Sequence, residues 1–158
     1  MKVDYINPVL TAVISTLETM AQLEAVPGTP VLKDSAKAPG IITGIIELKG
    51  PKACGSLALS FPEPVILDIY NKMLREDKTA IDEMVVDLVG ELANIVMGGA
   101  KKEFDEQGMK FGLTLPTIVD GKNHHIIHPI KGKVISLPLD ISSGTVYAEF
   151  CFKMHEEE

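Results

Sequence analysis

The sequence predicts a single α+β domain of two layers, in which an antiparallel-rich sheet packs against two long helices. Two long segments have the apolar spacing of helices, and hydrophobic runs rich in branched residues follow each of them. The order of elements is helix, strands, helix, helix, strands, which lacks the strict alternation of a doubly wound parallel sheet. Because each half places a long helix before its strands, the pattern also indicates an internal duplication.

The helices are predicted from apolar residues that recur every three or four positions. An Asn-Pro pair opens the first helix, over residues 7–21, as its N-cap and first helical residue. A shorter helix opens with Pro-Glu-Pro and covers residues 62–74, with an acidic residue near its start as the helix dipole favours. The second long helix is predicted over residues 79–105, and Gly108 is its expected C-cap.

The strands are predicted from hydrophobic runs rich in β-branched residues. Five runs cover residues 41–48, 53–61, 111–119, 133–139 and 145–152. Turn residues at 49–51 and 142–144 separate neighbouring runs and predict two hairpins, and Asp-Gly at 120–121 predicts a further turn. Residues 26–40 are rich in proline and glycine, so we expect a loop there with a short strand at residues 31–32.

The composition limits the size of the protein and the partners it can have. The 158 residues, 46% of them hydrophobic, suffice for one domain over residues 1–158 whose tail at 155–158 is expected to be frayed. The formal charge of −7 and the lack of a lysine or arginine cluster argue against nucleic acid as a partner. No apolar stretch approaches the roughly 20 residues of a membrane-spanning helix. The first residues lack a secretory signal, so the expected location is the cytoplasm.

Residues that form disulfides or bind metals give no strong signal. Cys54 and Cys151 lie in apolar strand-like runs, where reduced, buried thiols are expected. His124, His125 and His128 are close in sequence, but no thiolate or carboxylate stands nearby at a convincing ligand spacing. The sequence therefore predicts no metal site.

The candidate functional site is a polar strip on the second long helix. At about 100° per residue, Asp87, Glu91, Asn94 and Gly98 fall within a strip about 60° wide beside the apolar stripe of the helix. Gly90 and Gly98 remove side-chain bulk around the strip, so a partner protein could approach closely.

Two simpler explanations of this strip remain open at this stage. Polar residues on the flank of a helix commonly form a solvated face, and close packing within the chain also accounts for glycines. Asp87 and Glu91, however, repel each other at this spacing, and each glycine costs up to about 1 kcal/mol relative to alanine inside a helix. Such local losses of stability favour a contact surface.

Several segments together resemble a known protein family. Residues 5–8 read Tyr-Ile-Asn-Pro, residues 55–62 read Gly-Ser-Leu-Ala-Leu-Ser-Phe-Pro, and residues 87–99 contain the Asp, Glu and Asn of the strip followed by two glycines. Pro116 stands 22 residues after Asn94. This pattern resembles the CheC/CheX/FliY family of chemotaxis phosphatases, and especially its CheX branch, over most of the chain.

The resemblance implies an activity and assigns roles to the strip. Members of the family accelerate the loss of phosphate from the aspartyl phosphate of a phosphorylated response-regulator receiver domain, typically CheY. By this analogy Asn94 orients the attacking water, Glu91 anchors the lysine of the receiver, and Asp87 supports docking. Mg²⁺ is expected in the receiver, and no cofactor is expected in this chain.

The resemblance also bears on the number of sites and on assembly. Family members with two sites carry a second Glu and Asn pair on the first helix, whereas here Ala21 stands three residues after Glu18. A single site is therefore expected. Single-site relatives often dimerise through their sheets, so a homodimer through sheet edges is expected, with the strand at 145–152 as a candidate edge. The alternative function is a noncatalytic docking module for a receiver domain or a flagellar-switch component.

Overall fold

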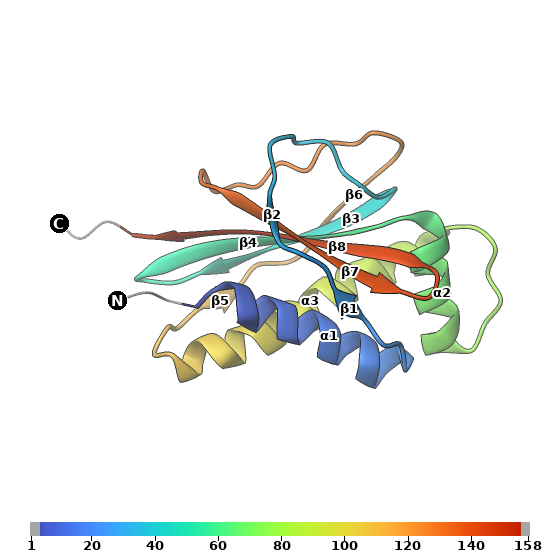
Figure 1. Cartoon of the computed structure of the whole chain (residues 1–158), viewed down its shortest axis with the longest axis horizontal. Coiled ribbons are helices and arrows are strands. Elements are labelled where there is room, and N and C mark those ends of the chain that lie inside the picture. Colours follow the sequence, from blue (N-terminus) through green and yellow to red (C-terminus); the bar gives the residue numbers. More distant parts are fainter. Residues whose placement is uncertain (1–3, 156–158) are drawn as a thin grey trace.

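The computed structural model describes residues 4–155 and has a helical layer packed on one face of an eight-stranded sheet. Helices α1 (Ile6–Ala21) and α3 (Glu83–Glu106) lie side by side against that face, and the shorter helix α2 (Glu63–Leu74) packs at one end of the sheet (Figure 1). The predicted α+β class and the two long helices are therefore confirmed. None of the helices in residues 4–155 is at once long and apolar enough to cross a membrane.

The sheet is antiparallel throughout. Its main order is β1 (Val26–Pro27), β7 (Val134–Ile141), β8 (Gly144–Met154), β4 (Ala53–Phe61), β3 (Ile42–Lys49) and β5 (Gly112–Leu113). Strand β2 (Val31–Leu32) also pairs with β7, and β6 (Thr117–Asp120) also pairs with β3. The two predicted hairpins are confirmed as β3–β4 and β7–β8.

Two predictions about the strands are wrong. The strand at 145–152 is not an edge, because β8 lies between β4 and β7 and pairs with both along its length. The strand predicted at 111–119 is divided into β5 and β6, because residues 114–116 leave the ladder and Pro116 packs toward α3. The actual edges are short strands interrupted by prolines and glycines, which is how natural sheets limit edge pairing. The expected homodimer stays a prediction.

Three helix and chain ends differ slightly from the predictions. The first helix begins at Ile6, one residue before the predicted N-cap, because Asp4 accepts hydrogen bonds from the backbone and side-chain amides of Asn7, at 3.1 and 3.0 Å. Helix α3 begins at Glu83 because Asp82 caps it. In the predicted frayed tail, the backbone N–H of His155 donates to the Lys52 carbonyl at 2.8 Å, while residues 156–158 lie outside the described residues.

The core lies between the helices and the apolar face of the sheet. Alternate residues of β3, β4, β7 and β8 point to the helices, and these positions are almost all apolar and buried. An aromatic cluster closes the end where α1 begins and α3 finishes, with ring centroids 5.0–6.4 Å apart; its members are Tyr5, Phe104, Phe111, Phe150 and Phe152. The shared cluster ties both long helices to the sheet.

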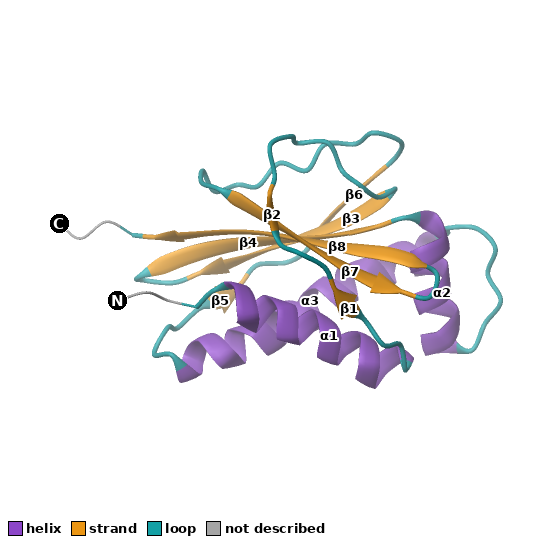
Figure 2. Ribbon diagram, viewed as in Figure 1, coloured by secondary structure: helices purple, strands orange, loops and turns teal. Residues whose placement is uncertain are grey.

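The opposite face of the sheet, called the polar face below, carries buried polar residues beside a small apolar cluster of Ala38, Ala58 and Ile126. It is covered by two loops, residues 33–41 and 121–133 (Figure 2). The buried polar residues of this face form hydrogen bonds with the loops. His124 Nε2 lies 2.6 Å from the hydroxyl of Thr43, which in turn donates to the Ser60 hydroxyl at 2.9 Å. The Ser60 hydroxyl also accepts the Gly40 N–H at 3.0 Å. The loops are therefore fixed to the sheet by satisfied polar groups.

A second polar group on this face centres on the buried carboxylate of Glu149. One of its oxygens pairs with Lys33 of the first loop, and the other lies 3.4 Å from His128 Nε2 of the second loop. His128 Nδ1 is hydrogen-bonded to the Ser56 hydroxyl at 2.8 Å. Two of the three histidines considered as metal ligands thus have structural partners, and no cluster suited to hold a metal occurs in residues 4–155.

The two cysteines lie on the polar face and are free in the structure. Cys151 is buried, and desolvation by burial raises the pKa of its thiol. Cys54 is half-buried on the neighbouring strand β4. The structure therefore contains reduced thiols, as expected, although only one of them is fully buried.

The spacing between α3 and the sheet depends on one glycine, and this dependence is testable. A Cβ at Gly44 of β3 would lie 3.1 Å from Val89 Cγ1 and 3.2 Å from the Val89 carbonyl oxygen of α3. We expect Gly44→Val to lower the free energy of unfolding by about 1–3 kcal/mol through overpacking, measured by urea denaturation. Gly112→Val in the exposed strand β5 is the control and should have a much smaller effect; equal losses would contradict the steric explanation.

Candidate functional site

The candidate site lies on α3, which is held by α1 on one side and by the sheet beneath it. The buried side chains of α3 recur every three or four positions and point to the sheet and α1: Val85, Leu88, Val89, Leu92, Ala93, Val96, Met97, Ala100 and Phe104. Because this buried stripe extends along almost the whole helix, it fixes which residues face the solvent.

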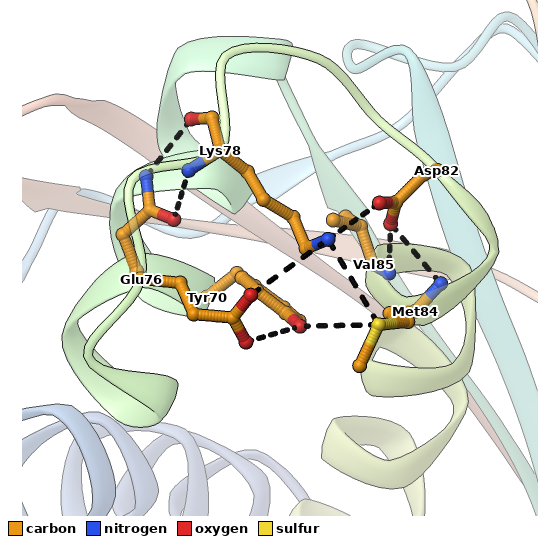
Figure 3. A network of polar contacts seen from close by, with 7 residues as sticks. Tyr70, Glu76, Lys78, Asp82, Met84 and Val85 are labelled. Atoms are coloured by element: carbon orange, nitrogen blue, oxygen red, sulfur yellow. Dashed lines mark hydrogen bonds and ion pairs between the residues drawn. The ribbon is translucent and has the colours of Figure 1, made fainter.

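A polar network orders the start of α3 (Figure 3). The side chain of Asp82 accepts the backbone N–H groups of Met84 and Val85, each at 3.1 Å, which is the usual N-cap arrangement. Lys78 Nζ donates to the other Asp82 oxygen at 2.5 Å and lies 5.2 Å from the centre of the Tyr70 ring. Tyr70 donates to Glu76 at 2.9 Å. The loop between α2 and α3 is therefore tied to the cap.

The network shifts the pKa values of its members. The hydrogen bond from Lys78, followed by that from the Val85 N–H, lowers the pKa of Asp82 below its ordinary value. The same Asp82–Lys78 bond is the main cause of the raised pKa of Lys78. Desolvation, and then the bond to Glu76, raise the pKa of the Tyr70 hydroxyl. At neutral pH the cap is thus an ionised carboxylate beside a protonated amine.

The predicted polar strip is exposed on the outer side of α3. Asp87, Glu91 and Asn94 are all exposed. Among residues 4–155 no hydrogen bond or ion pair holds their side chains, so a docking molecule would displace only water from them. A Cβ at Gly98 would meet nothing within 4 Å, so the strip continues there as open backbone.

Gly90 has a different role from Gly98. It is buried, and a Cβ there would lie 3.5 Å from Pro116 Cγ and 3.5 Å from Ile118 Cδ1. The simpler explanation considered for the glycines, packing within the chain, therefore accounts for Gly90. The same contact places Pro116 against α3 at Gly90, which directly precedes Glu91 in the helix. A partner contact at Gly90 itself stays a prediction that this burial does not favour.

A groove between α1 and α3 borders the strip on the side away from Pro116. The groove has a volume of about 400 Å³ and is lined by small residues of α1 and by five residues of α3: Ile95, Gly99, Lys102, Glu103 and Glu106. A Cβ at Gly99 would lie 3.4 Å from the Ala12 Cβ, so the two helices approach closely there. The candidate site is thus a ridge of polar side chains with a shallow groove beside it, and it is not a closed pocket.

Two features of this region were not predicted from the sequence. The capping role of Asp82 has a recognisable signal, because an Asp directly precedes a run with helical periodicity, but the predicted helix started earlier, at residue 79. The exposure of Leu115 has no such signal, because it lies within an apolar run that predicts a continuous strand.

The described residues thus form an α+β domain that presents a carboxylate and an amide on an open helical ridge. The family described as Chemotaxis phosphatase CheX matches residues 42–140. This match covers more than half of the chain. The chain therefore belongs to the CheX family of chemotaxis phosphatases.

Individual relatives agree with this assignment. A CheC-like superfamily protein from Shewanella sp. PV-4 is 46% identical, with a TM-score of 0.89 over 97% of this chain and 99% of its own. The CheY-P phosphatase CheX of Thermotoga maritima is 24% identical over 95% of this chain and 92% of its own. The CheX of Borrelia burgdorferi, solved in complex with CheY, BeF₃ and Mg²⁺, is 24% identical with a TM-score of 0.78 over 98% of this chain and 100% of its own.

The Asp82 cap predicts a pH-dependent contribution to stability. Because the pKa of Asp82 is lower in the folded chain than its ordinary value of 3.8, ionisation of Asp82 stabilises the fold above about pH 4. This contribution is lost as the pH falls through the lowered pKa. We expect Asp82→Ala to reduce the melting temperature by roughly 2–4 °C at pH 7, the shift typical of a lost N-cap in a domain of this size.

The same comparison at lower pH tests the cause. The melting curves of Asp82→Ala and the parent should converge as the pH is reduced below about 4. Asp77→Ala, in the same exposed loop, is the control and should melt with the parent at every pH. A constant difference across the pH range would show that the effect does not come from the ionised cap.

Proposed function

We propose that this chain accelerates hydrolysis of the aspartyl phosphate of a phosphorylated CheY-like receiver domain. The observation that supports the proposal is the pair Glu91 and Asn94, which project side by side and untethered from a rigid helix in a member of a phosphatase family. The complex of the Borrelia relative with CheY, BeF₃ and Mg²⁺ supports a receiver as the partner. In this proposal the metal belongs to the receiver, and this chain holds no cofactor.

The chemistry requires little more than positioning. An aspartyl phosphate is an activated acyl phosphate, and the receiver supplies the charges that stabilise its transition state, so a second protein has mainly to orient a water molecule in line with the phosphorus. A hundredfold acceleration corresponds to about 2.7 kcal/mol, which correct placement of the water can supply. No nucleophile on this chain is needed.

Asn94 is the residue proposed to orient the water. Its carboxamide has both a donor group and an acceptor group, so it can accept a hydrogen bond from the water and donate another to a phosphoryl oxygen. Since the Asn94 side chain has no partner within residues 4–155, it is free to make both bonds in the complex. It also lies on the central turns of α3, where the backbone is least free to move.

Glu91 is the residue proposed to anchor the receiver. Its carboxylate stands three residues before Asn94, so the two side chains emerge on neighbouring positions of the same face. A carboxylate in this position pairs with the lysine of the receiver's active site, which holds the receiver in register with Asn94. Asp87, one turn earlier on the same face, is proposed only to support docking of the receiver.

Substitutions on α3 test these roles separately. Asn94→Ala should lower the accelerated rate of phosphate loss about a hundredfold or more, with little change in affinity, because the water is no longer oriented. Glu91→Ala should raise KM about tenfold or more, because the anchoring ion pair is lost. Purified protein mixed with the phosphorylated receiver, followed by phosphate release, gives both values.

The first helix provides a matched control. Glu18 of α1 is an exposed helical carboxylate like Glu91, but Ala21 stands where a second site would need Asn. Glu18→Ala should therefore leave kcat and KM unchanged. Full activity of Asn94→Ala would overturn the assigned role, and binding of the receiver without any acceleration by the parent protein would favour the docking module.

The substitution Gly98→Ala should affect the stability of the fold and the binding of the receiver in opposite ways. Alanine at this open helical position should raise the free energy of unfolding by up to about 1 kcal/mol, because glycine is a poor helix former. The same methyl group would stand on the strip that the receiver covers, so KM for the phosphorylated receiver should rise. A more stable variant with unchanged KM, measured by denaturation and phosphate release, would remove Gly98 from the contact surface.

A further inference from the structure

Leu115 is the most exposed large hydrophobic residue in the described chain, with 88% of its surface accessible. It belongs to the segment 114–116, which separates β5 from β6 at the edge of the sheet. A single exposed leucine is ordinary on protein surfaces. The position of Leu115 is unusual because the residues on both sides of it are anchored.

The anchoring begins at Thr114. Its backbone N–H donates to the Glu47 carbonyl at 3.1 Å, and its hydroxyl accepts the Glu47 N–H at 2.9 Å. This pair of bonds replaces the ladder that β5 and β6 make on either side of it. The backbone before Leu115 is therefore fixed to β3.

The anchoring continues at Pro116, on the side of the functional helix. Pro116 packs over Gly90, where a Cβ would meet its ring at 3.5 Å, and Glu91 is the next residue of α3. Pro116 and Gly90 pack together, and Leu115 and Glu91 are the residues next to them in the chain. A receiver docked on a typical footprint of about 800 Å² centred on Glu91 would extend well beyond this contact and would reach Leu115.

We propose that Leu115 is an affinity-determining contact for the receiver domain, and that it packs on an apolar patch beside the phosphorylated aspartate. This proposal rests on the proposed function. The same partner is favoured because the acidic Glu91 is placed to pair with the lysine of the receiver's active site. Asn94 and the acidic residues orient the receiver, and Leu115 contributes apolar burial outside the reacting atoms.

This division follows from the energetics of interfaces. The ion pair of Glu91 contributes to affinity, but desolvation of its two charges offsets part of their attraction, whereas apolar burial carries no such cost. A leucine that is almost fully exposed in the free protein has nearly all of its side chain available for burial, and it is held on a rigid segment, so little entropy is lost on binding. Leu115 therefore affects binding much more than the chemical step.

The test is a binding measurement combined with kinetics. The probe is the CheY-type receiver of the same organism, activated with BeF₃ and Mg²⁺ and titrated by calorimetry into the parent and into Leu115→Ser. We expect Kd to rise about tenfold, which corresponds to about 1.4 kcal/mol, and kcat at saturating phosphorylated receiver to change less than twofold. Leu115→Met, which keeps a large apolar side chain, should have a Kd within about twofold of that of the parent.

A matched control is available on the opposite face. Ile127 is 74% exposed in the loop 121–133, on the face of the sheet that is not covered by helices. Ile127→Ser should leave Kd and kcat unchanged. Melting temperatures within a few degrees of the parent for both variants show that the fold is retained.

The outcomes separate the two proposals. A Kd for Leu115→Ser equal to that of Ile127→Ser would overturn the role of Leu115 while a phosphatase-active parent protein upholds the proposed function. A loss of kcat with unchanged Kd would also overturn it, because Leu115 would then act on the chemical step. A parent protein that neither binds the activated receiver nor accelerates phosphate loss would overturn the proposed function itself.

Discussion

The close packing of α3 against β3 at Gly44 and Val89 is the contact on which the rest of the structure depends. Because glycine lets the helix backbone approach the strand, the apolar stripe of α3 is buried along almost its full length. A helix buried on one stripe has no freedom to rotate about its axis, so Glu91 and Asn94 face outward in a fixed direction. The aromatic cluster at one end and the Asp82 cap at the other hold the same helix lengthwise.

The two faces of the sheet have different roles: one carries the hydrophobic core, and the other binds two loops through polar side chains. The helix-facing side is apolar and carries the core, whereas the other side places hydroxyls, histidines and a carboxylate under two loops. Each buried polar group there has a partner on the loops, so the absence of a helix on this side does not leave unsatisfied groups in these networks. The candidate site needs none of these residues, and sits on the helical side alone.

The features predicted well from the sequence are those specified by local pattern. The two long helices, the short helix and both hairpins follow from periodicity and turn residues, and the strip on α3 follows from its spacing. The features missed depend on contacts distant in sequence. The interior position of β8 is decided by pairing with β4 and β7, and the break between β5 and β6 by the packing of Pro116 on Gly90. Nor does periodicity show that His124 and His128 support loops, because their partners Thr43, Ser56 and Glu149 are distant in sequence.

Glu149 joins the two loops of the polar face through a single side chain, since one carboxylate oxygen contacts Lys33 and the other contacts His128. Neither loop can leave the sheet without exposing the charge that the other one shields. We therefore expect the two loops to open and close as one cooperative unit, so that amide protons in both segments exchange with solvent through the same rare event.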